Sequence, residues 1–379
     1  MFIVYRMSYL QFTPQQSLPQ WRPGSLASIR VVLGNNQRMS AGTLALSAKL
    51  HITKTITIGD NDVEVPIEWT DGVCYDPNIG LMNSLIGQVQ STLIRDDGAS
   101  RKLDDIQDYP ALCHVLNNVN RSGNFNLTTG ASDIEGVVPS ETLARASLSG
   151  PLSADGRCTG DIDVVSLLDW TPFNSAPLPN VAEIDLTIIL AELNKNFYLA
   201  GGKTEFPQGF NWYLTDIQAF CYAVPNTESK SAVSQYKGYS TVHHTMTSNT
   251  ANNSYLQLAP CSAISQVFTN LSKKSYHNRF RQDNLPPVKG YIINVNGRTS
   301  ALKFTLEDPT EQRINFIKSL NPSLMMTNSL AQTDGYGLGF NFLGLVPAGS
   351  TIQTTINCDP KTFNGQYDIY TISTYAGEF

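Results

Sequence analysis

Charged residues are scarce in this chain of 379 residues. They make up 15% of it, against about 25% in a typical soluble domain. Asn, Thr, Ser, Gly and Pro take their place, and this composition is typical of a β-rich protein with many turns. Few charges are also expected where a surface is buried against other subunits, because interface cores are depleted in charge. A neutral, merely polar surface is the alternative.

Acidic residues are missing altogether from residues 1–59. That segment holds six of the 26 basic residues, whereas all 32 acidic residues lie beyond it. The asymmetry predicts an N-terminal end that faces something anionic, such as nucleic acid or lipid headgroups. Arg6, Arg22, Arg30 and Arg38 are therefore candidates for contact with a polyanion or with another subunit.

Long apolar runs are also missing. No stretch approaches the 18 apolar residues of a membrane span, and the opening MFIVYRMSYLQF lacks the apolar region of a signal peptide. We therefore expect a protein made in the cell interior, in a reducing compartment, and not secreted by a signal peptide. The six cysteines contain no C-x-x-C, which argues against a zinc site or a thioredoxin-type redox pair.

Motifs for catalysis and for metal binding are missing too. There is no H-E-x-x-H and no G-x-S-x-G, and the neighbours His243 and His244 should point to opposite faces of a strand, where they cannot chelate one metal. The acid pairs 96–97 and 104–105 suit turns and caps better than the facing acids of a glycosidase. We expect no catalytic residue, no metal ligand and no cofactor.

Two further motifs have a structural and a functional interpretation. DGYGLGFNFLG (334–344) lacks the strand-to-helix turn of a phosphate loop, so its glycines are better explained by a tightly packed neighbour. KKSYHNRFR (273–281) interleaves aromatic and basic residues and suits nucleic acid or a subunit contact. Its candidate residues are Lys273, Lys274, Arg279 and Arg281.

Strand signals cover most of the chain. Residues 28–34, 43–58, 85–98, 161–170, 182–193, 212–225, 291–298, 336–344, 350–359 and 366–379 are apolar or alternate between apolar and polar. The alternation is cleanest in 182–193, which predicts a half-buried antiparallel strand. Residues 1–25 hold three prolines and four glutamines and predict an extended arm.

Two short helices interrupt the strands, at 108–117 and 308–321. In the first, Asp108 can cap the helix and Pro110 lies in its first turn. In the second, Asp308 is the predicted cap and Glu311 completes a capping box. Strand, turn, capped helix and three more strands therefore occur twice, which predicts a duplicated all-β sandwich; two unrelated β-domains are the alternative.

Residues 84–117, SLIGQVQSTLIRDDGASRKLDDIQDYPALCHVLN, resemble one known family. These are the double jelly-roll major capsid proteins of icosahedral DNA viruses, a lineage that includes adenovirus hexon and the capsid proteins of tailless lipid-containing phages and virophages. In that family a strand, a Gly-containing turn and an I-x-x-Y segment, here Ile106 to Tyr109, lead into a helix. The terminal segments STIQTTINCD and YDIYTISTYA also look like the last strands of the second roll.

The resemblance implies two eight-stranded antiparallel jelly rolls in tandem, each with one short inserted helix. The expected divisions are an arm at 1–25, rolls at 26–225 and 236–379, and a linker at 226–235. The chain would form homotrimers of pseudo-hexagonal outline that tile the virion capsid and meet minor capsid or vertex proteins. The arm would clasp a neighbour or lie at the inner face, near genome or membrane, and no enzymatic activity is implied.

Two other functions stay open at this point. A carbohydrate-binding or fibre-type β-sandwich would stack exposed aromatic residues, such as Trp212 and Tyr213, against sugar rings. A β-sandwich hydrolase would need acids that converge from distant strands, which spacing along the sequence does not reveal.

Overall fold

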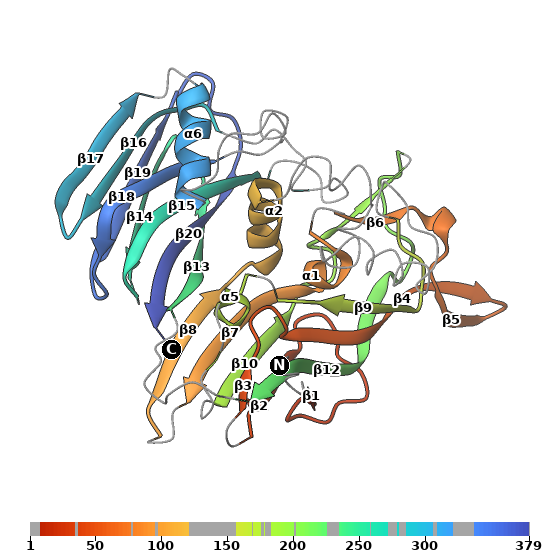
Figure 1. The fold of residues 1–379 in the computed structure, drawn as a ribbon. Coiled ribbons are helices and arrows are strands. Elements are labelled where there is room, and N and C mark those ends of the chain that lie inside the picture. Colours follow the sequence, from red (N-terminus) through yellow and green to blue (C-terminus); the bar gives the residue numbers. More distant parts are fainter. Residues whose placement is uncertain are drawn as a thin grey trace.

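The computed structural model describes residues 8–34, 37–76, 79–94, 98–120, 157–168, 170–175, 178, 183–200, 202–225, 235–257, 259–271, 279, 286–305, 309–320 and 337–378. Within these ranges most residues lie in β-strands, which form two sandwiches beside each other (Figure 1).

Sandwich 1 is built from the strands of the N-terminal half. One of its sheets has the order β1-β12-β4-β5, with β9 also on β4 and β3 on β12; its other layer has the order β8-β7-β10-β2. The bounds are β1 (Ser8–Phe12), β2 (Leu26–Val32), β3 (Gln37–Met39), β4 (Ala45–Ile58), β5 (Asn61–Pro66), β7 (Ile86–Ile94), β8 (Ser100–Ile106), β9 (Ile162–Ser166), β10 (Glu183–Leu190) and β12 (Asn211–Pro225).

Sandwich 2 is built from the C-terminal half. Its layers have the orders β18-β15-β20-β13 and β14-β19-β16-β17. The bounds are β13 (Gln235–Met246), β14 (Thr250–Leu256), β15 (Cys261–Asn270), β16 (Val288–Val295), β17 (Arg298–Thr305), β18 (Leu338–Val346), β19 (Thr351–Cys358) and β20 (Tyr367–Glu378).

The two sandwiches have the same topology. Reading along the chain, β1, β2, β4, β7, β8, β9, β10 and β12 correspond in order to β13 through β20. With this correspondence β1-β12-β4-β9 matches β13-β20-β15-β18, and β2-β10-β7-β8 matches β14-β19-β16-β17. The predicted duplication is therefore confirmed at the level of strand order.

Alternating burial explains how these strands form layers. Along β10 the side chains alternate between buried and half-buried, with Ile184, Leu186, Ile188 and Leu190 all at most 2% exposed. Since successive side chains point to opposite faces of a strand, this pattern fixes which face meets the core. The predicted half-buried strand at 182–193 is confirmed.

The inserted helices lie at equivalent places in the two sandwiches. α2 (Tyr109–Asn120) follows β8, and α6 (Pro309–Leu320) follows β17. The backbone N–H of Ala111 donates to Oδ1 of Asp108 at 3.1 Å, so the predicted cap of α2 is confirmed. The capping box predicted for α6 lies outside the described residues, since Asp308 and the side chain of Glu311 are not described.

Short elements complete sandwich 1. β6 and β11 pair with each other, and α1 packs against α2. Their bounds are a 3-10 turn at Trp69–Asp71, β6 (Val73–Tyr75), α1 (Leu81–Leu85), α5 (Pro172–Ser175) and β11 (Phe197–Leu199). None of the helices that the structure describes is both long and apolar enough to span a bilayer.

The prediction of an arm over residues 1–25 is wrong for β1. Ser8–Phe12 pairs antiparallel with β12 over five residue pairs, and further along Trp21, only 3% exposed, exchanges backbone hydrogen bonds with Leu214. Residues 1–7 and the predicted linker, apart from Gln235, lie outside the described residues. The other predicted division points stay predictions.

Candidate functional site at the junction of the two sandwiches

The two sandwiches meet along one parallel strand pair. β8 of sandwich 1 runs beside β13 of sandwich 2, with Ser240 opposite Asp105 and Thr241 opposite Ile106. Next to it, the backbone N–H of Gln107 donates to Oγ1 of Thr241 at 2.7 Å. This pairing makes a single eight-stranded sheet, β18-β15-β20-β13-β8-β7-β10-β2, out of one layer from each sandwich (Figure 1).

Two tyrosines and two glycines pack beside this pair. On the β13–β20 ladder Tyr236 lies opposite Gly377, and Gly238 lies opposite Tyr375. A Cβ atom on either glycine would overlap the ring of the facing tyrosine. The two rings meet edge to face with centroids 6.4 Å apart, an arrangement that aromatic pairs prefer. The glycines therefore leave the space that the rings occupy.

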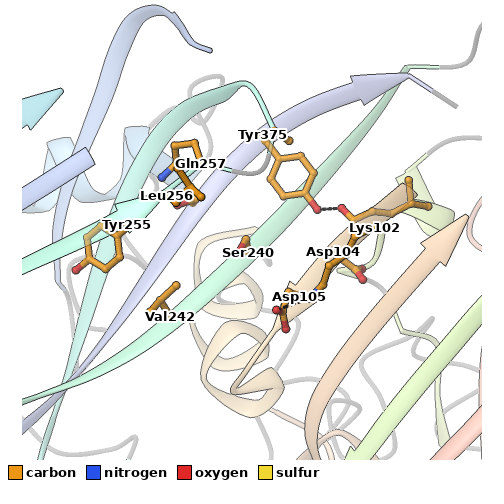
Figure 2. A pocket seen from close by; sticks show the side chains of 12 residues that line it. Lys102, Asp104, Asp105, Ser240, Val242, Tyr255, Leu256, Gln257 and Tyr375 are labelled. Atoms are coloured by element: carbon orange, nitrogen blue, oxygen red, sulfur yellow. Dashed lines mark hydrogen bonds and ion pairs between the residues drawn. The ribbon is translucent and has the colours of Figure 1, made fainter. Parts of the chain in front are cut away.

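Tyr375 connects sandwich 2 to β8 directly. Its hydroxyl donates a hydrogen bond to the backbone oxygen of Leu103, which Figure 2 marks with a dashed line. Beside this bond lies a cavity of about 30 Å³ lined by both sandwiches, including Lys102 and Asp105 from β8 and Gln257 from sandwich 2. The cavity has room for a water molecule.

Asp104 is a buried acid of β8 at the same junction. It is 2% exposed; its Oδ1 accepts a hydrogen bond from the hydroxyl of Ser91 on β7, while Oδ2 has no partner among the described residues. Burial raises the pKa of Asp104 to about 7, and the hydrogen bonds from Ser91 offset this only in part. The expectation of a turn or cap role is wrong for this acid pair, since both acids lie inside β8; residues 96–97 are not described.

A buried ion pair forms the second contact across the junction. Arg279 lies between β15 and β16 of sandwich 2, and Asp108 precedes α2 of sandwich 1. The guanidinium is bidentate, with Nη1 3.0 Å from Oδ2 and Nη2 3.0 Å from Oδ1, and the side chains are 13% and 3% exposed. Nη1 also donates to the hydroxyl of Tyr370 at 3.0 Å, and Nη2 to Oδ1 of Asn196 at 2.6 Å.

Burial and the neighbouring charges act in opposite directions on the pKa values of Asp108 and Arg279. Burial alone would raise the pKa of Asp108, but the guanidinium of Arg279, the ammonium of Lys195 and hydrogen bonds from Arg279 and Ala111 hold that pKa well below its ordinary value. Burial would likewise lower the pKa of Arg279, whereas Asp108 and Tyr370 keep it above its ordinary value. The pair is therefore fully charged at neutral pH, and it satisfies hydrogen-bonding groups from both sandwiches.

Helices add a third contact. Within sandwich 2, the ammonium of Lys237 on β13 lies 3.1 Å from the backbone oxygen of Leu320, at the C-terminal end of α6, where a positive charge is favoured, and the same residue also reaches across the junction to α5 of sandwich 1. The backbone N–H of Lys237 donates to the hydroxyl of Ser175 in α5 at 3.0 Å. Leu320 and Phe316 of α6 also belong to the apolar core of sandwich 1, so this core extends across the junction.

The structure describes four of the eight basic residues predicted to face a polyanion or another subunit, and these four have different surroundings. Arg22 is exposed beside Gln20, Arg30 is bound to Asp185 of the neighbouring strand β10, and Arg38 lies on β3. Arg279 is buried in the junction, so the prediction that it contacts nucleic acid or another subunit is wrong. Arg6, Lys273, Lys274 and Arg281 lie outside the described residues.

The aromatic residues considered for sugar binding do not form an exposed platform. Trp212 is 0% exposed, and its Nε1 donates to the backbone oxygen of Leu193 at 3.0 Å. Tyr213, on the opposite face of β12, stacks on His51 with centroids 4.7 Å apart. The prediction that Trp212 is an exposed sugar-stacking residue is therefore wrong, because strand alternation turns it into the core.

Two other predictions about local motifs agree with the structure. His243 stacks on Tyr370 and His244 meets Tyr255 edge to face, so the two histidines have different neighbours. The glycine-rich segment enters strand β18, where a Cβ on Gly339 would overlap the helix α6. Within the described residues, no group of three or more His, Cys, Asp or Glu could hold a metal ion.

The sequence contained a signal for the junction that motif searching missed. Tyr236-Lys237-Gly238 and Tyr375-Ala376-Gly377 are two Tyr-x-Gly triplets, and they pair reciprocally on neighbouring strands. By contrast, nothing in the local sequence connects Asp108 with Arg279, which is 171 residues further along.

Comparison with solved structures identifies the fold. A chain in the cryo-EM structure of the Sputnik virophage has a TM-score of 0.58 and 10% sequence identity, covering 98% of this chain and 86% of that one. The Faustovirus major capsid protein has a TM-score of 0.54 and 11% identity, covering 100% and 91%. The chain is a double jelly roll. No protein-family model matches the sequence, and no curated protein matches it.

In a double jelly roll, the junction described above is the contact between the two rolls. Each sandwich is one roll, and the shared sheet, the tyrosine–glycine packing and the buried ion pair hold the two rolls side by side. The expected fold class is thereby confirmed, including the helix inserted in each roll.

Proposed function

We propose that this chain is the major capsid protein of an icosahedral virus, and that its work is assembly rather than catalysis. Three copies form a capsomer of pseudo-hexagonal outline, and these capsomers tile the virion shell. One observation carries the proposal: a single chain presents two sandwiches of identical strand order at a fixed junction. Two like units in each of three chains supply six like units, which is what a hexagonal tile requires.

The junction supports this role because a shell tile must keep its shape. Bidentate Arg–carboxylate pairs are among the stronger and more directional polar contacts, and here one is buried between the rolls. The core of sandwich 1 also includes Tyr236, Tyr370 and Tyr375 of sandwich 2. Sliding of one roll past the other would break both kinds of contact at once.

The partners follow from the same proposal. Each capsomer meets neighbouring capsomers, and minor capsid or vertex proteins close the shell. The genome or an inner membrane lies at the inner face, and the exposed Arg22 is a candidate for contact with its negative charge.

Electron microscopy of the purified chain tests the proposal. We expect trimers of pseudo-hexagonal outline, or closed shells, with a mass by light scattering of three times the 41.6 kDa chain or of larger multiples. A sample that stays monomeric across concentration and salt would contradict it. A glycan array with clear hits and no self-assembly, or turnover of a substrate panel, would favour the carbohydrate-binding or hydrolase alternative instead.

A further inference from the structure

The junction inside the chain joins two strands that are not equivalent. β8 is the fifth strand in the order shared by the two sandwiches, and its counterpart in sandwich 2 is β17. β13 is the first strand of that order, and its counterpart in sandwich 1 is β1. A contact between unlike surfaces is heterologous, and it leaves one copy of each surface unused on the same chain.

Among the strands that the structure describes, the two unused ones both lie at sheet edges. β1 ends the sheet β1-β12-β4-β5, and β17 ends the sheet β14-β19-β16-β17. β8 and β13 would be edges of their own layers in the same way if they did not pair with each other. An edge strand presents unpaired backbone N–H and C=O groups, which is a template for another strand.

The chemistry of β1 differs from that of the other edge of its sheet. β1 reads SYLQF, with no charge and no proline, and Tyr9 is 53% exposed on it. β5, at the opposite edge, reads NDVEVP and carries two acids and a terminal proline. Charges and proline are the usual protection of an edge that must not pair. Of these two strands, only β5 has that protection.

We propose that β17 of one copy pairs in parallel with β1 of the next copy, repeating between chains the β8–β13 contact made within the chain. Three copies then close a ring in which six contacts of one kind alternate between intramolecular and intermolecular. The inference rests on the proposed function, and it assigns the surface through which the trimer is made. The strand pairing itself is expected to be short, as it is for Ser240–Asp105 and Thr241–Ile106.

Paired cysteines test the contact in the full chain. Gln11→Cys on β1 is combined in turn with Thr299→Cys, Ala301→Cys and Lys303→Cys on β17, so that several parallel registers are sampled. The matched control combines Gln11→Cys with Asp62→Cys on β5, the protected edge of the same sheet. The parent chain is a second control, because its own six cysteines are all buried.

We expect at least one β1–β17 pair to give covalent dimers and trimers on mild oxidation. Groups held at a contact have effective concentrations near millimolar against micromolar in bulk, so this pair should cross-link about a thousandfold faster than the control. Pseudo-hexagonal trimers without any β1–β17 cross-link above the control would overturn this inference and leave the proposed function standing. Monomers alone would overturn both, and a ladder beyond three chains would overturn the closed ring.

Hydrogen exchange on the unaltered chain gives a measurement that does not depend on the variants. Amides of β1 and β17 should be protected in the trimer and lose protection when the protein is diluted to monomers, while β5 stays unchanged. Equal exchange of β1 and β17 in both states would overturn the pairing.

Discussion

Replacing Arg279 by methionine should destabilise the chain strongly. The substitution keeps an unbranched apolar side chain but removes the guanidinium, and with it two hydrogen bonds to Asp108 and one each to Tyr370 and Asn196. Asp108 stays buried with the ammonium of Lys195 at 3.4 Å. Removing one partner of a buried ion pair costs about 3–5 kcal/mol, because the other charge is left uncompensated.

Arg30→Met is the matched control for this prediction. Arg30 also binds an aspartate through two nitrogens, with Nε 2.8 Å and Nη2 3.2 Å from the carboxylate of Asp185. Its side chain is 45% exposed, however, and that of Asp185 is 28% exposed. Solvent screens such a pair, so Arg30→Met should shift the urea midpoint far less than Arg279→Met, although both remove the same group.

Urea unfolding at neutral pH measures the difference, since the midpoint shift multiplied by the slope gives the change in free energy of unfolding. A double-mutant cycle with Asp108→Asn, which keeps an oxygen for the cap, should show a coupling of about 1–3 kcal/mol.

The effect of pH has a definite sign. The folded pKa of Asp108 lies below its ordinary value, so the stability from the pair is full above about pH 4, the ordinary pKa of aspartate, and is lost as the pH falls below it. The cost of Arg279→Met should shrink in acid. A cost no larger than that of Arg30→Met, or one independent of pH, would refute the reasoning.

Two further predictions concern the same junction. Because burial raises the pKa of Asp104 to about 7 and an unfolded aspartate titrates near 4, stability should fall between about pH 4 and pH 7 and level off above. Asp104→Asn should flatten this dependence of the free energy of unfolding on pH, measured by urea unfolding at several pH values. An unchanged dependence would count against the raised pKa of Asp104. Gly238→Ala should cost about 1–3 kcal/mol by overpacking against Tyr375, whereas Gly344→Ala on β18, with open space around it, should leave the thermal midpoint nearly unchanged.

Patterns among residues that are close in the sequence made much of the fold predictable. Alternation identified β10, and the aspartate–proline starts identified both helices, because periodicity and capping depend on residues a few positions apart. β1 was missed because its five residues run directly into a stretch rich in proline and glutamine and give a weak signal of their own. Its place depends on β12, more than 200 residues away.

The functional site was harder to predict for the same reason. Arg279 lies in a basic, aromatic-rich segment that locally resembles a surface patch, yet its partner is the cap of a helix in the other sandwich. Trp212 and Tyr213 are neighbours with opposite environments, and alternation alone could have separated them. Contacts between residues that are far apart in the sequence decide which strands of the two sandwiches meet. No local sequence pattern predicts them.

The burial of the sulfur atoms limits the reactivity of the folded chain. All six cysteines are buried, and burial raises the pKa of Cys221 to about 11 and those of Cys261 and Cys358 to about 12. Thiolates are the reactive form, so the folded chain offers almost no nucleophilic sulfur. On the proposed function, a shell built from this chain would keep its sulfur chemistry unaltered on passing from reducing to oxidising surroundings, and a maleimide dye would label the protein only where unfolding has begun.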